Sequence, residues 1–394
     1  MILRAKEGQL AVPGIARDVA AVVGALLVLT AAISVVGTLI VPRPVGSWLT
    51  RLVDKAVNGG FRMAAAPIKS YRRRDRVFAA EAAVLLLAQL GAWLVVFYLG
   101  YALLFWPFVP DITAALVTAG PGLWGIGGIG SAEVAGAGPR IIQDLSALSG
   151  IITITLQISY LPTLYGAFSR RETEITLLAA RAGVPSWGPE LLARTRYALG
   201  SGLSTIDTLP DLYERWEAWS ADLAESHTTY LPLVRFRSPK PRHSWVVALL
   251  AVLDSAALYL ALAPGSAPEV QARLCLRSGL ICLSEVARAM GLNVPPTDIP
   301  DMAAGITLTY EDFLEAVQRL KEVDFPIERE PDEAWTEFVG WRVNYEKAAY
   351  AIAFAVHAVK GPWSGPRRHP DPVIYPLRPA PGRPPEKRHR APGD

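Results

Sequence analysis

The chain has 394 residues, of which 51% are hydrophobic and 19% are charged, and its net charge is +3. These values exclude an intrinsically disordered protein, and so small a net charge gives no indication of a nucleic-acid partner. The positive mean hydropathy of +0.27 instead indicates a membrane protein.

Three long apolar runs without a charged residue follow one another along the chain. They cover Val19–Val41, Ala82–Val109 and Leu145–Phe168 and contain 23, 28 and 24 residues. About 20 helical residues cross the hydrocarbon core of a bilayer, so each run is long enough to span it. The first run is also too long for the apolar part of a signal peptide. We therefore predict an all-α integral membrane protein with three transmembrane helices, at 19–41, 82–109 and 141–168.

The distribution of basic residues predicts the orientation of these helices. The loop 42–77 contains nine lysines and arginines against two aspartates. Because basic loops favour the cytoplasmic side, we expect this loop and everything after Ser169 to lie in the cytoplasm. The protein is then a multi-pass protein of the plasma membrane. Residues 1–18 and the loop after the second run then lie outside. The sequence RRRDR in the basic loop could also bind nucleic acid, but its place between two spans favours the orientation signal.

A glycine-rich stretch, AGPGLWGIGGIGS, lies between the second and third runs at Ala119–Ser131. Three of its glycines match the dinucleotide-binding pattern G-x-G-x-x-G, but that motif requires a preceding strand, and an apolar span precedes this one. Non-helical backbone is tolerated at membrane depth only where protein or water surrounds it. We therefore predict a re-entrant pore loop at 111–130, with a short helix at Asp111–Leu123 and a returning segment whose carbonyl groups line an ion path.

The pore module 78–168, span–loop–span, resembles the pore-domain family of potassium channels. It is most similar to bacterial channel-like proteins with one extra leading span and a helical cytoplasmic domain. The resemblance covers roughly residues 19–183 and rests on Pro42-Arg43 after the first span, on TAGPGLWGIGG, and on ISYLPTLYGAFSRRE running into LLAARAG. It implies a homotetramer around a central axis, permeant monovalent cations, and gating through the cytoplasmic domain by an unknown ligand or protein partner.

The family filter Thr-Val-Gly-Tyr-Gly-Asp is only partly kept in this chain. The aliphatic residue and the central glycine remain, but the threonine, the tyrosine, the second glycine and the aspartate are replaced. We therefore expect a weakly selective or non-selective cation pore. The alternative is a non-conducting membrane scaffold or sensor derived from such a channel. The filter-like positions are Gly125, Ile126, Gly127, Gly128, Ile129 and Gly130.

Four further residues are candidates for the ion pathway. Glu133 and Asp144 could form its outer mouth, although Asp144 could equally face lipid headgroups. Gly150 lies near the family's inner-helix glycine, and Pro162 removes a helical hydrogen bond near the cytoplasmic end, so both are candidates for a gating hinge. Glycine and proline are also ordinary residues of spanning helices, which is the alternative for this pair.

From residue 169 to 360 the apolar spacing predicts a helical cytoplasmic domain. Thr309 with Asp312 begins one helix as a capping box, and Pro331 begins another that we expect to continue to about Val359. The run Trp245–Ala263 contains Asp254 at its centre. It could be a fourth span, but the cost of a central aspartate favours a buried helix of the domain.

The remaining features indicate no chemistry. Residues 361–394 contain ten prolines and predict a disordered tail. Cys275 and Cys282 lie seven residues apart, which on one helix is too far for a disulfide and predicts two buried thiols. The five histidines show no metal-ligand spacing. No nucleophile–base pair or paired acid stands out, so we expect neither an enzyme nor a cofactor or metal site.

Overall fold

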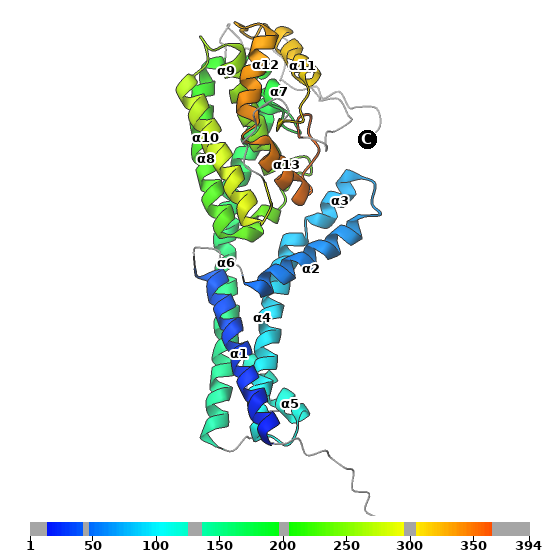
Figure 1. Ribbon diagram of the computed structural model, residues 1–394, viewed down its shortest axis with the longest axis vertical. Coiled ribbons are helices and arrows are strands. Elements are labelled where there is room, and N and C mark those ends of the chain that lie inside the picture. Colours follow the sequence, from blue (N-terminus) through cyan, green and yellow to red (C-terminus); the bar gives the residue numbers. More distant parts are fainter. Residues whose placement is uncertain (1–13, 42–46, 125–135, 197–204, 295–304, 365–394) are drawn as a thin grey trace, which may run out of the picture. The chain divides into compact units, whose positions relative to one another are not determined.

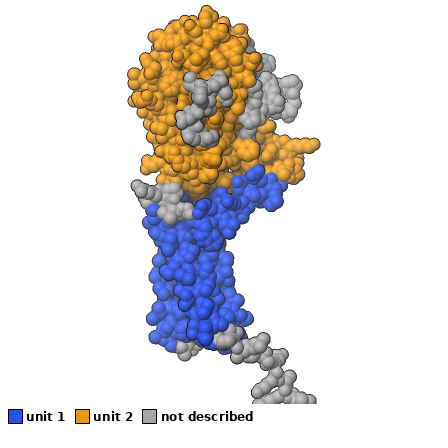
Figure 2. All heavy atoms as spheres, viewed as in Figure 1, with its two compact units in different colours: residues 1–64, 83–163 blue, residues 65–82, 164–394 orange. Residues whose placement is uncertain are grey.

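The computed structural model describes residues 14–41, 47–124, 136–196, 205–294 and 305–364, and every regular element among them is helical (Figure 1). The predicted all-α class is therefore confirmed. The chain divides into a first unit, residues 1–64 with 83–163, and a second unit, residues 65–82 with 164–394, coloured separately in Figure 2. Within the described residues, four helical segments are long and apolar enough to cross a membrane, which indicates a membrane-associated protein. They are Gly14–Leu39, Tyr71–Phe108, Ala137–Ala182 and Trp245–Leu262.

The first unit contains three long helices that run side by side, together with two shorter ones (Figure 1). The predicted first span corresponds to α1. The second corresponds to α4, followed by a short 3-10 turn. The third begins in this unit and continues without a break beyond Phe168, so the expected boundary at Ser169 is not the end of a helix. The elements are α1 (Gly14–Leu39), α2 (Trp48–Ala65), α4 (Glu81–Phe105), η1 (Trp106–Phe108), α5 (Ile112–Leu123) and α6 (Ala137–Ala182).

Helices α1 and α4 approach each other closely at two glycines. A Cβ atom on Gly24 would lie 2.5 Å from the carbonyl oxygen of Gly100, and one on Gly100 would lie 3.0 Å from that of Gly24. Such contacts between small residues are typical of helices that associate within a bilayer, where burial of apolar surface does not drive association. The large apolar side chains of α1 point away from this contact and are exposed, as expected for a helix that faces lipid: Ile15, Val22, Leu26, Leu29 and Ile33.

The second unit is a bundle packed around α9, in which every residue from Trp245 to Leu262 is buried. Helices α7, α8, α10, α12 and α13 all contact it. A helix that is apolar all round belongs either in lipid or in the centre of a fold, and here protein covers it on all sides. The other helices are α3 (Tyr71–Phe78), α7 (Gly188–Arg194), α8 (Leu209–Thr229), α10 (Glu269–Ala289), α11 (Tyr310–Lys321), α12 (Pro331–Arg342) and α13 (Glu346–Ala355).

Two expectations for this unit are confirmed and one is wrong. The capping box at Thr309 and Asp312 begins α11, and both cysteines are buried on α10 as free thiols. The helix expected from Pro331 to about Val359 is interrupted between Arg342 and Glu346. No glycine or proline marks this interruption, because tertiary contacts at this point rather than local propensity determine it.

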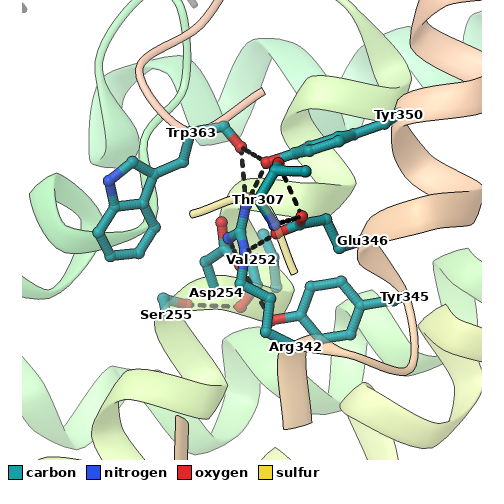
Figure 3. A network of polar contacts seen from close by, with 9 residues as sticks. All are labelled: Val252, Asp254, Ser255, Thr307, Arg342, Tyr345, Glu346, Tyr350 and Trp363. Atoms are coloured by element: carbon teal, nitrogen blue, oxygen red, sulfur yellow. Dashed lines mark hydrogen bonds and ion pairs between the residues drawn. The ribbon is translucent and has the colours of Figure 1, made fainter. Parts of the chain in front are cut away.

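Those contacts form a buried polar network around Asp254, the residue that interrupts the apolar run (Figure 3). Arg342 Nη1 lies 2.6 Å from Asp254 Oδ1, and Arg342 Nε lies 2.6 Å from Glu346 Oε2. The Tyr345 hydroxyl donates to the same oxygen of Asp254 at 2.9 Å. Arg342 also donates to the carbonyl oxygen of Trp363 at 2.9 Å. The cost of burying one carboxylate in the core is thus offset by a guanidinium with partners on several elements.

We predict that Arg342→Met lowers the free energy of unfolding by about 3–5 kcal/mol at pH 8, because two buried carboxylates lose their partner. Burial raises the pKa of Asp254 to about 6 even beside Arg342. Without the guanidinium this pKa rises further above its unfolded value, so acidification from pH 8 toward 6 protonates Asp254 in the variant first and narrows the deficit. Urea unfolding of the full-length protein in detergent, followed by tryptophan fluorescence, measures both effects.

Arg273→Met is the matched control, since its ion pair with Glu269 is about half exposed and exposed pairs contribute about 1 kcal/mol or less. An Arg342→Met deficit as small as that of the control, or one independent of pH, would contradict the structural role of the network.

Candidate functional site

The predicted filter-like residues Gly125–Gly130 and the outer-mouth residue Glu133 lie outside the described residues. The structure does describe the helices on either side of them. The candidate site is therefore the group of helices α4, α5 and α6 in the first unit, which we call the hairpin; α5 precedes the filter-like positions in the sequence and α6 follows them.

Helix α5 occupies the positions predicted for the short helix of the loop. Asp111 is its N-cap, and the side-chain Oδ1 accepts a hydrogen bond from the amide of Ala114 at 2.8 Å. The helix has 12 residues, which corresponds to about 18 Å and is too short to cross a hydrocarbon core of about 30 Å. It ends at Leu123, so in the sequence the filter-like positions Gly125–Gly130 follow shortly after its C-terminal end.

Two tyrosines of α4 hold the hairpin together. The Tyr98 hydroxyl donates to the carbonyl oxygen of Leu116 in α5 at 3.1 Å. The Tyr101 hydroxyl donates to the carbonyl oxygen of Leu145 in α6 at 3.0 Å and lies 2.7 Å from Ser149 Oγ. Sequence reasoning missed both residues. Their only signal is a pair of hydroxyl groups three residues apart in an otherwise apolar run, which places them on neighbouring positions of one helix face.

Gly150 has a packing role in this structure. A Cβ atom at this position would lie 2.0 Å from the carbonyl oxygen of Leu123, the last residue of α5. No side chain fits there, so this glycine allows the end of α5 to lie directly against α6. Hinge motion at Gly150 remains a prediction.

The other two candidates on α6 are exposed. Asp144 lies in its second turn, and Pro162 lies in its interior without ending it. Buried polar side chains on the same helix were not anticipated, among them Ser146, Thr153 and Gln157. Thr153 donates to the carbonyl oxygen of Ser149, and Ser146 lies beside Gly122 at the end of α5.

The second unit contains a docking contact for the basic loop. Arg237 Nη1 lies 2.7 Å from Asp75 Oδ1 on α3, and its Nη2 donates to the carbonyl oxygens of Val356 and His357. Phe78 of α3 stacks on the ring of His357 at 4.5 Å between centroids. Burial raises the pKa of Asp75, although Arg237 opposes this. Asp75, the single acidic residue of RRRDR, thus anchors α3 to Arg237. The sequence indicated it only as part of a basic loop.

The continuation of α6 is held by a second buried arginine. Arg171 donates to the carbonyl oxygens of Leu233 at 2.9 Å and Phe236 at 2.7 Å, and pairs with Glu172 at 2.8 Å. Its Nη1 lies 3.1 Å from His227 Nε2. Burial and the neighbouring Arg171 lower the pKa of His227 well below its ordinary value. Because arginine only donates, this neutral imidazole accepts through Nε2.

Both contacts meet on one short stretch, residues 233–237, which we name the junction segment. It receives Arg171 from α6 through two carbonyl groups, and it binds Asp75 of α3 through Arg237. Arg235 in the same segment lies 3.2 Å from Glu81, the first residue of α4. The start of α4 and the extension of α6 are therefore fixed to the same five residues.

Comparison with known proteins yields no relative: no family model, no curated protein and no solved structure matches the chain. Within the described ranges, no group of three or more His, Cys, Asp or Glu side chains is placed to hold a metal ion.

We predict that Gly150→Val destabilises the hairpin by about 1–3 kcal/mol, because the side chain must push the end of α5 away from α6. Gly166→Ala is the matched control on the same helix, where the nearest atom is the end of the flexible Arg170 side chain at 3.9 Å. Thermal unfolding in mild detergent compares the two. Equal melting temperatures for both variants and the wild type would show that Leu123 does not pack against Gly150.

We predict that Arg237→Gln releases α3. Breaking a buried ion pair costs about 3 kcal/mol, which raises the population of the state with α3 undocked by about a hundredfold. The four arginines of α3 make it a trypsin substrate once it opens, so limited proteolysis of the full chain measures the change. Lys240→Gln, an exposed position near the junction segment, should leave the cleavage rate unchanged. Asp75→Asn combined with Arg237→Gln should cost less than the sum of both; strict additivity would argue against a direct pair.

Proposed function

We propose that the chain forms a potassium-channel-like cation pore with weak or no selectivity, built from four copies around an axis. One observation carries the proposal: α5 is capped at Asp111, held by Tyr98 and packed against Gly150, and it ends shortly before the filter-like positions Gly125–Gly130 in the sequence. One hairpin cannot enclose a path, so several copies are required. From the orientation that the basic residues predict, we propose that the protein lies in the plasma membrane with its second unit, residues 361–394 included, in the cytoplasm.

Two physical effects favour a cation at the end of α5. The C-terminal end of a helix carries partial negative charge, which attracts cations over the last turn. Glycine backbone then presents carbonyl oxygens that can replace the hydration shell of an ion. Gly125, Gly128 and Gly130 provide neither the hydroxyl, the bracing ring nor the carboxylate of a potassium filter. Ile129, as a β-branched residue, disfavours a left-handed conformation. A path without strict selectivity follows.

We further propose that the second unit gates the pore through the junction segment. Arg171 lies on the same helix as the candidate hinge residues Gly150 and Pro162, and Glu81 begins α4. A rearrangement of residues 233–237 on ligand or partner binding would act on both helices at once. Such coupling requires a segment with two conformations, and binding of a ligand or partner in the cytoplasm must shift the equilibrium between them.

The test is ion flux into liposomes that contain the purified protein. Wild type should pass potassium and sodium with little preference, and Gly127→Val should abolish flux because the new side chain disfavours the backbone shape and narrows the path. Gly91→Ala, on α4 with no atom within 4 Å of the added Cβ, should conduct normally. Mass measurement in mild detergent should give a tetramer for all three proteins.

A second variant decides between the pore and the non-conducting scaffold or sensor. Combining Gly125→Thr, Gly128→Tyr, Ile129→Gly and Gly130→Asp restores the family filter and should raise the preference for potassium. If neither wild type nor this variant conducts, or if the folded protein is a monomer, the pore proposal fails. The same second unit on a membrane anchor would then act as a scaffold or sensor.

A further inference from the structure

Helix α2 carries an exposed face that neither the pore hairpin nor the second unit's contacts use. Its large apolar side chains Trp48, Leu52 and Met63 are 56%, 55% and 74% exposed. Its basic side chains Arg51, Lys55 and Arg62 are exposed as well. Soluble proteins rarely expose several large apolar side chains along one helix face, and such a face is typical of an interaction surface.

The two sets of side chains lie side by side along α2. At 100° per residue, Trp48, Leu52 and Met63 fall within about 60° of one another, and the three basic residues form a neighbouring stripe about 40° wide. The one acidic residue of the helix, Asp54, lies outside both stripes and is half-buried. This combination of an apolar stripe with an adjoining basic stripe is typical of helices that lie in the plane of a membrane interface.

The start of α2 is fixed to the end of a candidate span. Ser34 Oγ, near the end of α1, donates to Ser47 Oγ at 2.9 Å, and the Trp93 indole of α4 donates to Ser34 Oγ at 2.9 Å. Leu49 is buried in the apolar cluster formed by α1 and α4. The first turn of α2 is therefore level with the last turns of α1, where that helix leaves the bilayer. From there α2 runs obliquely to α1 rather than parallel to it (Figure 1).

We infer that α2 is an interfacial helix that docks on the anionic lipid headgroups of the membrane crossed by α1. The apolar stripe enters the headgroup region, and Arg51, Lys55 and Arg62 bind phosphate groups of anionic lipids. The charge of the face is complementary to the cytoplasmic leaflet, which is negative. The inference rests on membrane association of α1 and not on conduction, so it can fail or succeed independently of the proposed pore.

The test uses the full-length protein in lipid nanodiscs, with an environment-sensitive fluorophore on Met63→Cys. Cys275 and Cys282 are fully buried, and burial raises the pKa of both thiols, so the label is specific. In discs of phosphatidylcholine with phosphatidylglycerol the emission should shift to shorter wavelength, and brominated lipid should quench it. In phosphatidylcholine alone both effects should be weaker.

Arg51→Gln, Lys55→Gln and Arg62→Gln together should remove the dependence on phosphatidylglycerol. Each basic residue near an anionic surface contributes about fivefold to the docked population, so the triple change should reduce it by about a hundredfold. The matched control replaces three exposed basic residues of the second unit, Arg277, Arg288 and Lys321, with glutamine and should behave as wild type.

Three outcomes would overturn the inference. The label could stay in water in both kinds of disc. Its shift could depend on phosphatidylglycerol even in the triple variant, which would remove the basic stripe from the explanation. Finally, the emission could be shifted in the discs while brominated lipid fails to quench it, which would show that protein, such as a second copy of the chain, covers α2.

Discussion

A buried arginine cannot give up its charge, so it must be surrounded by acceptors. Arg171 satisfies this requirement with the carbonyl groups of Leu233 and Phe236, and Arg237 does so with Asp75 and the carbonyl groups that follow α13. The position of the junction segment is a consequence of these demands. Any displacement of this segment exposes or orphans two guanidinium groups, so within the second unit it fixes the extension of α6 and the first residue of α4.

Different forces stabilise the interior of each unit. In the first unit, backbone contacts at Gly24, Gly100 and Gly150 and a few hydroxyl groups determine how helices meet. In lipid the hydrophobic effect does not distinguish one apolar neighbour from another, so close packing and hydrogen bonds decide. In the second unit, the hydrophobic effect assembles the bundle around α9, and the buried ion pair Asp254–Arg342 determines how α9 and α12 are aligned. Asp254 Oδ1 accepts hydrogen bonds from both Arg342 and Tyr345, and only a few relative positions of the helices allow both donors to reach it.

The sequence predicts those features that depend on composition or on near neighbours. The length of each apolar run is sufficient to predict α1, α4 and α6, and Asp111 marks the start of α5. Neither length nor composition can distinguish a buried helix from a spanning one, because α9 has the composition of both. What decides is Arg342, 88 residues away, and such a distance leaves no pattern in one chain.

The same limit applies to the candidate site. Tyr98 and Tyr101 act through carbonyl groups 18 and 44 residues further along. The family resemblance suggested a hinge at Gly150, whereas its packing depends on where α5 ends. Asp75 appeared as an exception in a basic loop, since its partner Arg237 lies 162 residues later.

In the proposed pore, the geometry of α5 has a consequence for assembly. With 12 residues, α5 is too short to span a bilayer, and the proposal has non-helical backbone follow it at membrane depth, where the polar groups of such backbone need partners other than lipid. Those groups must find protein, water or ions. The last carbonyl group of α5 lies against Gly150 of the same chain, but one hairpin cannot surround the glycine stretch. Neighbouring copies and a hydrated axis would supply the missing partners, so assembly and access of water to the axis are two parts of a single requirement. A scaffold without conduction would have to meet the same requirement with protein groups alone.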